Sequence, residues 1–140
     1  MPRVTIGLPC FNQPEGLKTT LESIKNQTYQ DWQCIVLDDG SDPPLDVSAF
    51  NDERIKLHRF PENRGIPFGS NYLFQNWRTE FSAVLGCDEI ICPTKLDDQV
   101  KFFDENPDID SIWGVPGNGP MGPVQSWEQY LLQSHNRSRE

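Results

Sequence analysis

The sequence predicts an α/β fold, with an open, mainly parallel sheet flanked by helices. Strand-like and helix-like segments alternate along the chain, with no internal repeat and no low-complexity tract. The apolar core of the second predicted strand, Cys34 to Leu37, is continuous rather than alternating, which is typical of a strand covered on both faces. The length of 140 residues, with 36% hydrophobic and 24% charged residues, suits one globular domain with a buried core.

The predicted elements follow in a regular order. Five strands are expected, the third more polar and therefore toward a sheet edge: 3–9, 32–39, 54–60, 81–86 and 110–115. Apolar residues at i, i+4 or i, i+4, i+7 predict helices over 12–27, 68–78 and 93–106, and 45–50 is expected as a short helix. Pro14 suits the first turn of the first helix, and Asn12 with Glu15 has the spacing of a capping box.

The character of the chain changes after residue 115. Residues 1–115 carry the alternating strands and helices, whereas 116–140 reads as a Gly/Pro-rich loop followed by an amphipathic helix that stops at the chain end. We therefore expect one α/β domain over 1–115 and the start of a truncated second portion over 116–140.

The charge and composition of the chain limit the classes of molecule that it can bind. The formal charge of −9 and the pI near 4.6 argue against a nucleic-acid-binding surface. An anionic ligand would have to bind to local positive groups: helix N-termini, a few Arg or Lys side chains, or a metal. The sequence has neither a long apolar run nor a leader, so we expect no membrane span, a cytoplasmic location and free thiols at the four cysteines.

Polar residues follow three of the predicted strands, in the segments "PCFN" (9–12), "DDGS" (38–41) and "GCDE" (86–89). In open parallel sheets, ligands bind beyond the carboxyl ends of the strands. Asp38 or Asp39 can accept hydrogen bonds from a base N–H or a ribose hydroxyl, although Asp and Gly also favour plain turns. Asp88 and Glu89 are hard oxygen ligands suited to Mg²⁺ or Mn²⁺, or else they merely end a strand.

The aromatic and cysteine residues of these segments also have ordinary structural explanations. Phe11 could stack on a base or belong to the core, and Cys10 and Cys87 lack an obvious general base that would make either a catalytic thiol. No glycine-rich phosphate loop follows any predicted strand.

Taken in order, these segments resemble the start of the inverting glycosyltransferases of family 2, which have the GT-A fold. The resemblance covers residues 3–115 and is carried by "VTIGLPCFNQPEGLKTTLESIKNQTYQDWQCIVLDDGSD", "RIKLHRFPENRGIPFGSNYLFQNW" and "AVLGCDEIICPTKLDDQVKFFDENPDID". It implies transfer of a sugar from a nucleotide-sugar donor, most simply UDP-linked, to a glycan or other acceptor, with Mn²⁺ or Mg²⁺ as cofactor.

The resemblance also implies site residues. Pro9, Phe11 and Asp39 would line the nucleoside pocket, and the full nucleotide-sugar set would be Pro9, Cys10, Phe11, Asn12, Asp38, Asp39, Asn71, Cys87 and Asp88. The family's Asp-x-Asp metal motif falls on Gly86, Cys87 and Asp88, so its last acid is retained and its first is lost. Asp88 is the expected metal ligand, with Glu89 as a candidate second ligand.

The catalytic base of the family lies well beyond the metal motif. Here 52 residues follow Asp88, and the late carboxylates Glu128 and Glu140 sit in no recognisable base motif. We therefore expect the base to be absent from this chain. Two alternatives stay open: a non-catalytic nucleotide-sugar-binding module of the same fold, and a phospho-acceptor signalling domain with acids at strand ends.

Overall fold

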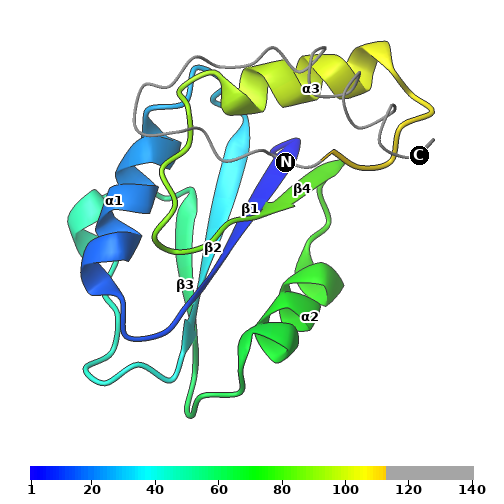
Figure 1. Ribbon diagram of the computed structural model, residues 1–140. Coiled ribbons are helices and arrows are strands. Elements are labelled where there is room, and N and C mark those ends of the chain that lie inside the picture. The colour runs from blue at the N-terminus through cyan, green and yellow to red at the C-terminus, as the bar shows by residue number, and fades with distance from the viewer. Residues whose placement is uncertain (113–140) are drawn as a thin grey trace, which may run out of the picture. The chain divides into compact units, whose positions relative to one another are not determined.

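The computed structural model describes residues 1–112 and shows a four-stranded sheet in which all neighbouring strands run parallel (Figure 1). The strand order is β3-β2-β1-β4. Their bounds are β1 Val4–Cys10, β2 Trp32–Asp39, β3 Ile55–Phe60 and β4 Phe81–Val84. The open parallel sheet predicted from the sequence is confirmed, with β3 at an edge as its polarity indicated.

Helices cover both faces of this sheet (Figure 1). The elements between the strands are α1 Pro14–Lys25, the 3-10 turn η1 Ser48–Phe50, α2 Ile66–Asn76 and α3 Lys95–Glu105. The larger core cluster contains the apolar residues of α1 and α3, whereas Leu73 of α2 belongs to a smaller cluster with Leu37 and Phe60. None of the described helices is long and apolar enough to cross a membrane.

The continuous apolar run of β2 is explained by these two layers. Successive side chains of a strand point to opposite faces. Cys34 and Val36 are completely buried in the larger cluster, while Ile35 and Leu37 pack in the smaller cluster with α2. A strand with a helix layer on each side has no face left for polar residues, and the predicted two-sided burial is confirmed.

The strand order places a switch point beside β1. The chain passes from β1 through α1 to β2 on one side, and β4 pairs with β1 on the other side. Connections that leave in opposite directions open a crevice at the carboxyl ends of the central strands. The segments after β1, β2 and β4 are those that carry the polar residues.

Several boundaries differ from the predictions. The capping box is wrong: α1 has Gln13 as N-cap with no side-chain capping bond, and Asn12 adopts a left-handed φ of 52° instead. Pro14 does begin the helix as predicted. The expected helix over 45–50 is only the turn η1. The strand β4 ends at Val84, although Leu85 N still donates to Gly7 O of β1 at 3.0 Å.

The last elements predicted from the sequence lie partly or wholly outside the described residues. Residues 110–112 form no strand, and the rest of the strand expected at 110–115 lies outside the described residues. The loop and helix expected over 116–140 also lie outside them.

Candidate active site

Three loops meet at the carboxyl edge of the sheet. Asn12 and the turn after β2 are joined by two hydrogen bonds, from Asn12 N to Ser41 Oγ and from Asp42 N to Asn12 Oδ1, both at 2.9 Å. The loop after β4 meets the start of α1, where the Cys87 thiol donates to Gln13 Oε1 at 2.7 Å. The structure therefore brings the three polar segments together, and the bond between Cys87 and Gln13 joins residues 74 apart in sequence.

The two consecutive aspartates of β2 point to opposite faces. Asp38 lies on the α1 face, where its carboxylate is completely buried and accepts hydrogen bonds from Ser41 N at 2.9 Å and Leu45 N at 3.1 Å, and from the Arg59 guanidinium. Burial by itself raises the pKa of the Asp38 carboxyl, but the hydrogen bonds outweigh it and hold that pKa below its usual value. These contacts are those of a residue that stabilises a turn, and a contact between Asp38 and nucleotide stays a prediction.

Asp39 lies on the α2 face. Its two carboxylate oxygens accept hydrogen bonds from the backbone N–H groups of Arg64 and Gly65, each at 2.8 Å. Gly65 is the N-cap of α2, so the carboxylate sits at the positive end of that helix. A carboxylate has about four acceptor positions, so two remain for a ligand N–H.

A glycine makes this approach of the loop to β2 possible. Gly40 has a φ of 76°, and a Cβ there would lie 2.5 Å from the carbonyl carbon of Glu62 and 2.6 Å from the nitrogen of Asn63. Any side chain at this position would push away the loop that Asp39 binds. Gly40 therefore helps to place Asp39 beside α2.

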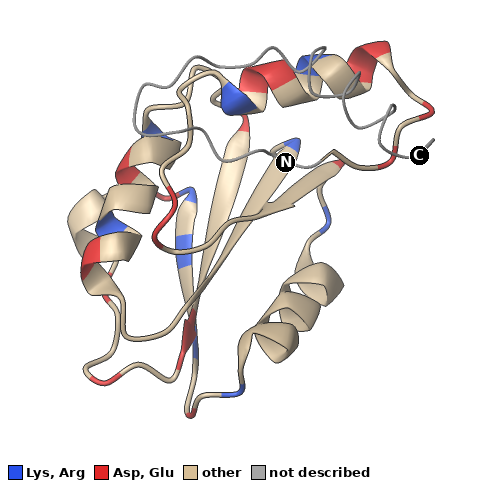
Figure 2. Cartoon of the chain, in the orientation of Figure 1, with Lys and Arg blue, Asp and Glu red and all other residues tan. Residues whose placement is uncertain are grey.

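Pro9 and Asn71 lie on the same face as Asp39, whereas Phe11 follows the end of β1. Pro9 contacts Gly69 of α2, Asn71 is exposed on α2, and Phe11 is 45% exposed. α2 carries no Lys, Arg, Asp or Glu (Figure 2). A ligand on this face would meet an uncharged helix and the apolar surfaces of Pro9 and Phe11.

The acidic residues of the loop after β4 converge on one point. Asp88 and Glu89 are exposed, and a Cβ on Gly86 would lie 3.2 Å from Asp88 Oδ1 and 3.1 Å from Glu89 Oε1. Two hard oxygen donors beside the same residue suit Mg²⁺ or Mn²⁺, which usually take one or two carboxylates plus phosphate and water oxygens. Within residues 1–112 there is no group of three or more His, Cys, Asp or Glu that could hold a metal by themselves.

The first turn of α1 determines where this loop lies. A Cβ on Gly16 would stand 2.9 Å from Cys87 O and 3.2 Å from Asp88 Cβ, so the helix and the loop are in direct backbone contact. Sequence analysis missed Gly16 because nothing in its neighbours shows that residue 87 packs on it.

Gly16→Ala is expected to destabilise the protein by about 1–3 kcal/mol because the new methyl group overlaps the Cys87 carbonyl. A solvated helix glycine would instead gain about 0.5–1 kcal/mol from the same change. Urea unfolding measures the free energy of unfolding, and Lys18→Ala, an exposed position of the same helix, should change it by less than about 0.5 kcal/mol. A gain in stability for Gly16→Ala would refute the contact.

One cation near the edge was also missed. The Arg64 guanidinium lies 3.9 Å from the centre of the Phe68 ring, at the loop whose backbone binds Asp39. Sequence alone did not mark Arg64, because it lies outside the three strand-end segments. Lys95 begins α3 beside the end of α1, where Leu96 N donates to Gln27 Oε1 at 3.0 Å. Burial lowers the pKa of the Lys95 ammonium group although the nearby Glu89 opposes that shift.

The thiols of Cys10 and Cys87 complete this edge. Both residues are buried, and their side chains are hydrogen-bonded to each other. The bond to Cys87 and burial raise the pKa of Cys10 far above its usual value, whereas the bond from Cys10, helped by the Phe11 N–H, lowers the pKa of Cys87. Each thiol therefore changes the pKa of the other.

One hollow of the described surface does not coincide with this edge. It has a volume of about 480 Å³, lies between α1 and η1, and is lined by residues that include Leu17, Lys25 and Phe50. None of the sequence-predicted site residues lines it. A second hollow, of about 310 Å³, is lined by Asn12 together with residues 42–46 of the segment after β2. Asp39, Asp88 and Glu89 line neither hollow, so the site is identified by its convergent polar groups.

The sheet order, the two helix layers and the acidic groups at the carboxyl edge define a Rossmann-like α/β domain of the GT-A class. A family model for glycosyl transferase family 2 matches residues 5–138. The chain belongs to glycosyl transferase family 2.

The relatives and solved structures agree with this assignment. An uncharacterised glycosyltransferase of Methanocaldococcus jannaschii is 31% identical over 145 residues, spanning 99% of this chain and 46% of the relative. The Escherichia coli enzyme UDP-Glc:alpha-D-GlcNAc-diphosphoundecaprenol beta-1,3-glucosyltransferase WfgD is 30% identical over 105 residues, spanning 74% of this chain and 42% of the enzyme. The chain thus spans less than half the length of either relative.

Two solved structures share the fold. S. aureus TarS in complex with UDP-GlcNAc superposes with a TM-score of 0.72 at 22% identity, covering 89% of this chain and 37% of TarS. The mannosyltransferase PcManGT from Pyrobaculum calidifontis, in complex with GDP-Man and Mn²⁺, superposes with a TM-score of 0.63 at 23% identity, covering 73% of this chain and 32% of that enzyme.

Proposed function

We propose that this domain binds the nucleotide of a UDP-sugar at the carboxyl edge of its sheet and serves as the donor half of an inverting glycosyltransferase. The observation that carries the proposal is the separation of two acidic groups along one edge. Asp39 faces α2 with free acceptor positions, and Asp88 and Glu89 converge beside α1. One can hold a base and the other the cation that accompanies a diphosphate.

On the α2 face, Asp39 is the proposed acceptor for the N3–H of uracil. The two backbone N–H groups that it binds hold the carboxylate still, so little ordering is left for the ligand to provide. Pro9 and Phe11 supply apolar surface for the base. Asn71 is exposed on α2, and its contact with the nucleotide stays a prediction.

At the loop after β4, Asp88 and Glu89 are the proposed ligands of a divalent cation. When bound, the cation would neutralise the charge that develops on the leaving diphosphate. Gly16 and the Cys87 side chain hold the loop, and hence Asp88, against α1. The family has an acid at the position of Gly86. Its absence leaves Asp88 and Glu89 as two carboxylates where three would otherwise stand, which favours a modest metal affinity.

We further propose that the acceptor and the base that deprotonates its hydroxyl are held by parts of the protein outside the described residues. The relatives being about twice as long supports this. Gly86 also favours a second candidate function, donor binding without transfer. Family membership displaces the phospho-acceptor alternative, and the burial of Asp38 agrees with that.

Calorimetric titration tests the proposal directly. UDP is expected to bind about tenfold more tightly with Mn²⁺ than with EDTA, a difference of about 1.4 kcal/mol. CDP should bind at least about tenfold more weakly than UDP, because its N3 presents a lone pair and not an N–H to Asp39. Equal affinity for UDP and CDP would remove Asp39 from the base site.

A matched pair of variants assigns the metal. Asp88→Asn should lose the Mn²⁺ dependence of UDP binding while keeping the weaker, metal-free affinity. Asp108→Asn removes an equally exposed carboxylate away from the edge and should behave as the wild type. UDP binding that is equally strong with and without Mn²⁺ in the wild type would exclude the metal role of Asp88.

A further inference from the structure

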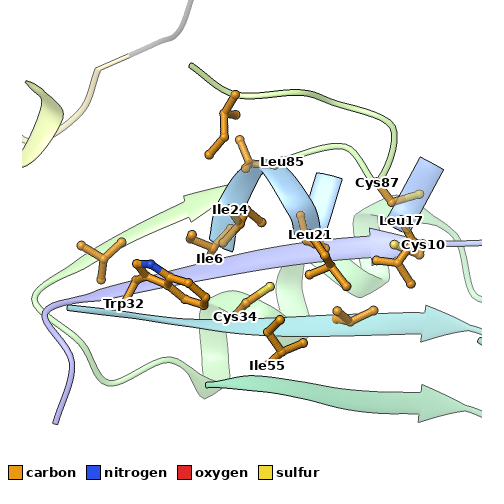
Figure 3. Close-up of a cluster of buried hydrophobic side chains, with 14 of the residues drawn as sticks. Ile6, Cys10, Leu17, Leu21, Ile24, Trp32, Cys34, Ile55, Leu85 and Cys87 are labelled. Atoms are coloured by element: carbon orange, nitrogen blue, oxygen red, sulfur yellow. The ribbon is translucent and has the colours of Figure 1, made fainter. Parts of the chain in front are cut away.

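Cys10 and Cys87 meet at the carboxyl end of β1 (Figure 3). Cys10 is the last residue of that strand, and Cys87 lies in the loop after β4. Their side chains are hydrogen-bonded, and the two residues are only 2% and 4% exposed. The two thiols thus lie in contact inside the proposed donor site, and Asp88 follows Cys87 directly in the chain.

The other two cysteines provide contrasting environments. Cys34 is completely enclosed in β2, and Cys92 is exposed, with its sulfur 3.6 Å from Thr94 Oγ1. They serve as internal comparisons, one inaccessible thiol and one accessible thiol outside the pair.

We propose that Cys10 and Cys87 are a modification site for hydrogen peroxide, which converts them to a reversible disulfide, and that this disulfide weakens nucleotide binding at Asp88. The second part rests on the proposed function, and the first does not.

The oxidation transfers two electrons from the two thiols to peroxide. The Cys87 sulfur attacks one peroxide oxygen, the O–O bond breaks, and the other oxygen leaves as water with the thiol proton. The Cys10 sulfur then attacks the Cys87 sulfur, the S–O bond breaks, and the hydroxyl leaves as a second water with the Cys10 proton. Cys87 is the first to react because its loop continues into exposed Asp88, whereas Cys10 is enclosed in the sheet.

The geometry also indicates which side must move. A disulfide holds its sulfurs about 2.05 Å apart, closer than any hydrogen-bonded pair of thiols. Cys10 is paired with Asp38 in the parallel ladder, so the strand holds it in place. The loop that carries Cys87 must therefore shift. It cannot move closer to α1, because it is already in close contact with Gly16: a Cβ there would lie 2.9 Å from Cys87 O.

Asp88 shares this movement because it follows Cys87 directly. Ligand-binding groups need placement within about 0.5 Å to work, so a shift of the loop takes Asp88 away from its position beside Glu89. Reduction of the disulfide would restore it.

The test treats the 140-residue chain with hydrogen peroxide and then with dithiothreitol. Peptide mapping by mass spectrometry should show a Cys10–Cys87 cross-link with the loss of two hydrogen atoms. The dissociation constant for UDP with Mn²⁺ should rise about tenfold and return after reduction. Cys92→Ser should keep both effects, and Cys10→Ser should lose both.

Each result decides one part of the proposal. Intact Cys10 and Cys87 thiols after Cys92 has been oxidised, or a cross-link to Cys34 or Cys92, would overturn the modification site. A Cys10–Cys87 cross-link with unchanged UDP affinity would overturn its effect on binding. If the reduced protein does not bind UDP at all, the proposed function fails, while the peptide map still decides the disulfide. Should Cys10→Ser not fold, the oxidised and reduced wild type provide the same comparison.

Discussion

Asp39→Ala is expected to lower the affinity for UDP about 100-fold, which corresponds to about 2.8 kcal/mol. The change removes the proposed acceptor for the uracil N–H. It also leaves the backbone N–H groups of Arg64 and Gly65 without the carboxylate that each now binds at 2.8 Å. The loop before α2 would lose its link to β2, so the preformed edge of the site would be lost together with the acceptor.

Two further variants separate these effects. Asp39→Asn has the same shape and one acceptor oxygen, but its NH₂ group opposes a donor, so UDP affinity should still fall at least about tenfold. Glu62→Ala removes an exposed carboxylate of the neighbouring loop and should leave the affinity unchanged. Calorimetry on folded Asp39→Ala with wild-type affinity would contradict the assignment of the base site.

Asp38→Ala is expected to be the most destabilising single change at this edge. The carboxylate is completely buried and is bonded to two backbone N–H groups and the Arg59 guanidinium. The change leaves the buried backbone N–H groups of Ser41 and Leu45 unsatisfied, at a cost of about 1–3 kcal/mol each, whereas the Arg59 side chain is 35% exposed and can be solvated. Since a domain has only about 5–15 kcal/mol of stability in total, the variant should unfold at a markedly lower urea concentration. Glu53→Ala, an exposed carboxylate near the start of β3, is the matched control.

Asp38 should also contribute to acid sensitivity. Burial raises the pKa of this carboxyl, but bonds from Ser41, Leu45 and Arg59 outweigh burial, so the folded-state pKa lies below the usual 3.8. A carboxyl of this kind stabilises the fold above its unfolded pKa, and its contribution is lost as the pH falls through the folded value. The free energy of unfolding should therefore decline below about pH 4, and the decline should be shallower in Asp38→Asn. An equally steep decline in that variant would show that other groups, such as Asp52 and Asp46, account for it.

The elements of the sheet were predictable because local patterns control them. The continuous run of β2 and the helical spacing of α1 follow from which faces each element must bury. The edge position of β3 follows in the same way from its polar residues. Ends of elements were less predictable: Asn12 satisfies the turn after β2 instead of capping α1, because a partner from another strand was closer than the helix.

The sequence predicted which segments form the site, but it did not predict the role of each residue within them. Asp38 and Asp39 are identical in type and adjacent, and sequence could not say which of them faces the ligand. The alternation of the strand sends one into the turn at Leu45 and the other to the start of α2. Only the positions of those two neighbours distinguish a residue that stabilises the turn from a proposed ligand-binding residue.

By itself, the sequence determined the fold class, the family to which the chain belongs, and the three segments that supply the chemistry. Only the tertiary structure decided that Asp38 is buried, that Glu89 joins Asp88 beside Gly86, that Gly16 supports their loop, and that Cys10 meets Cys87. The physical reason is that the fold class, the family and the three segments depend on local periodicity and composition. The features that only the structure decided depend on contacts between parts of the chain that lie apart in sequence, which exist only once the strands have paired.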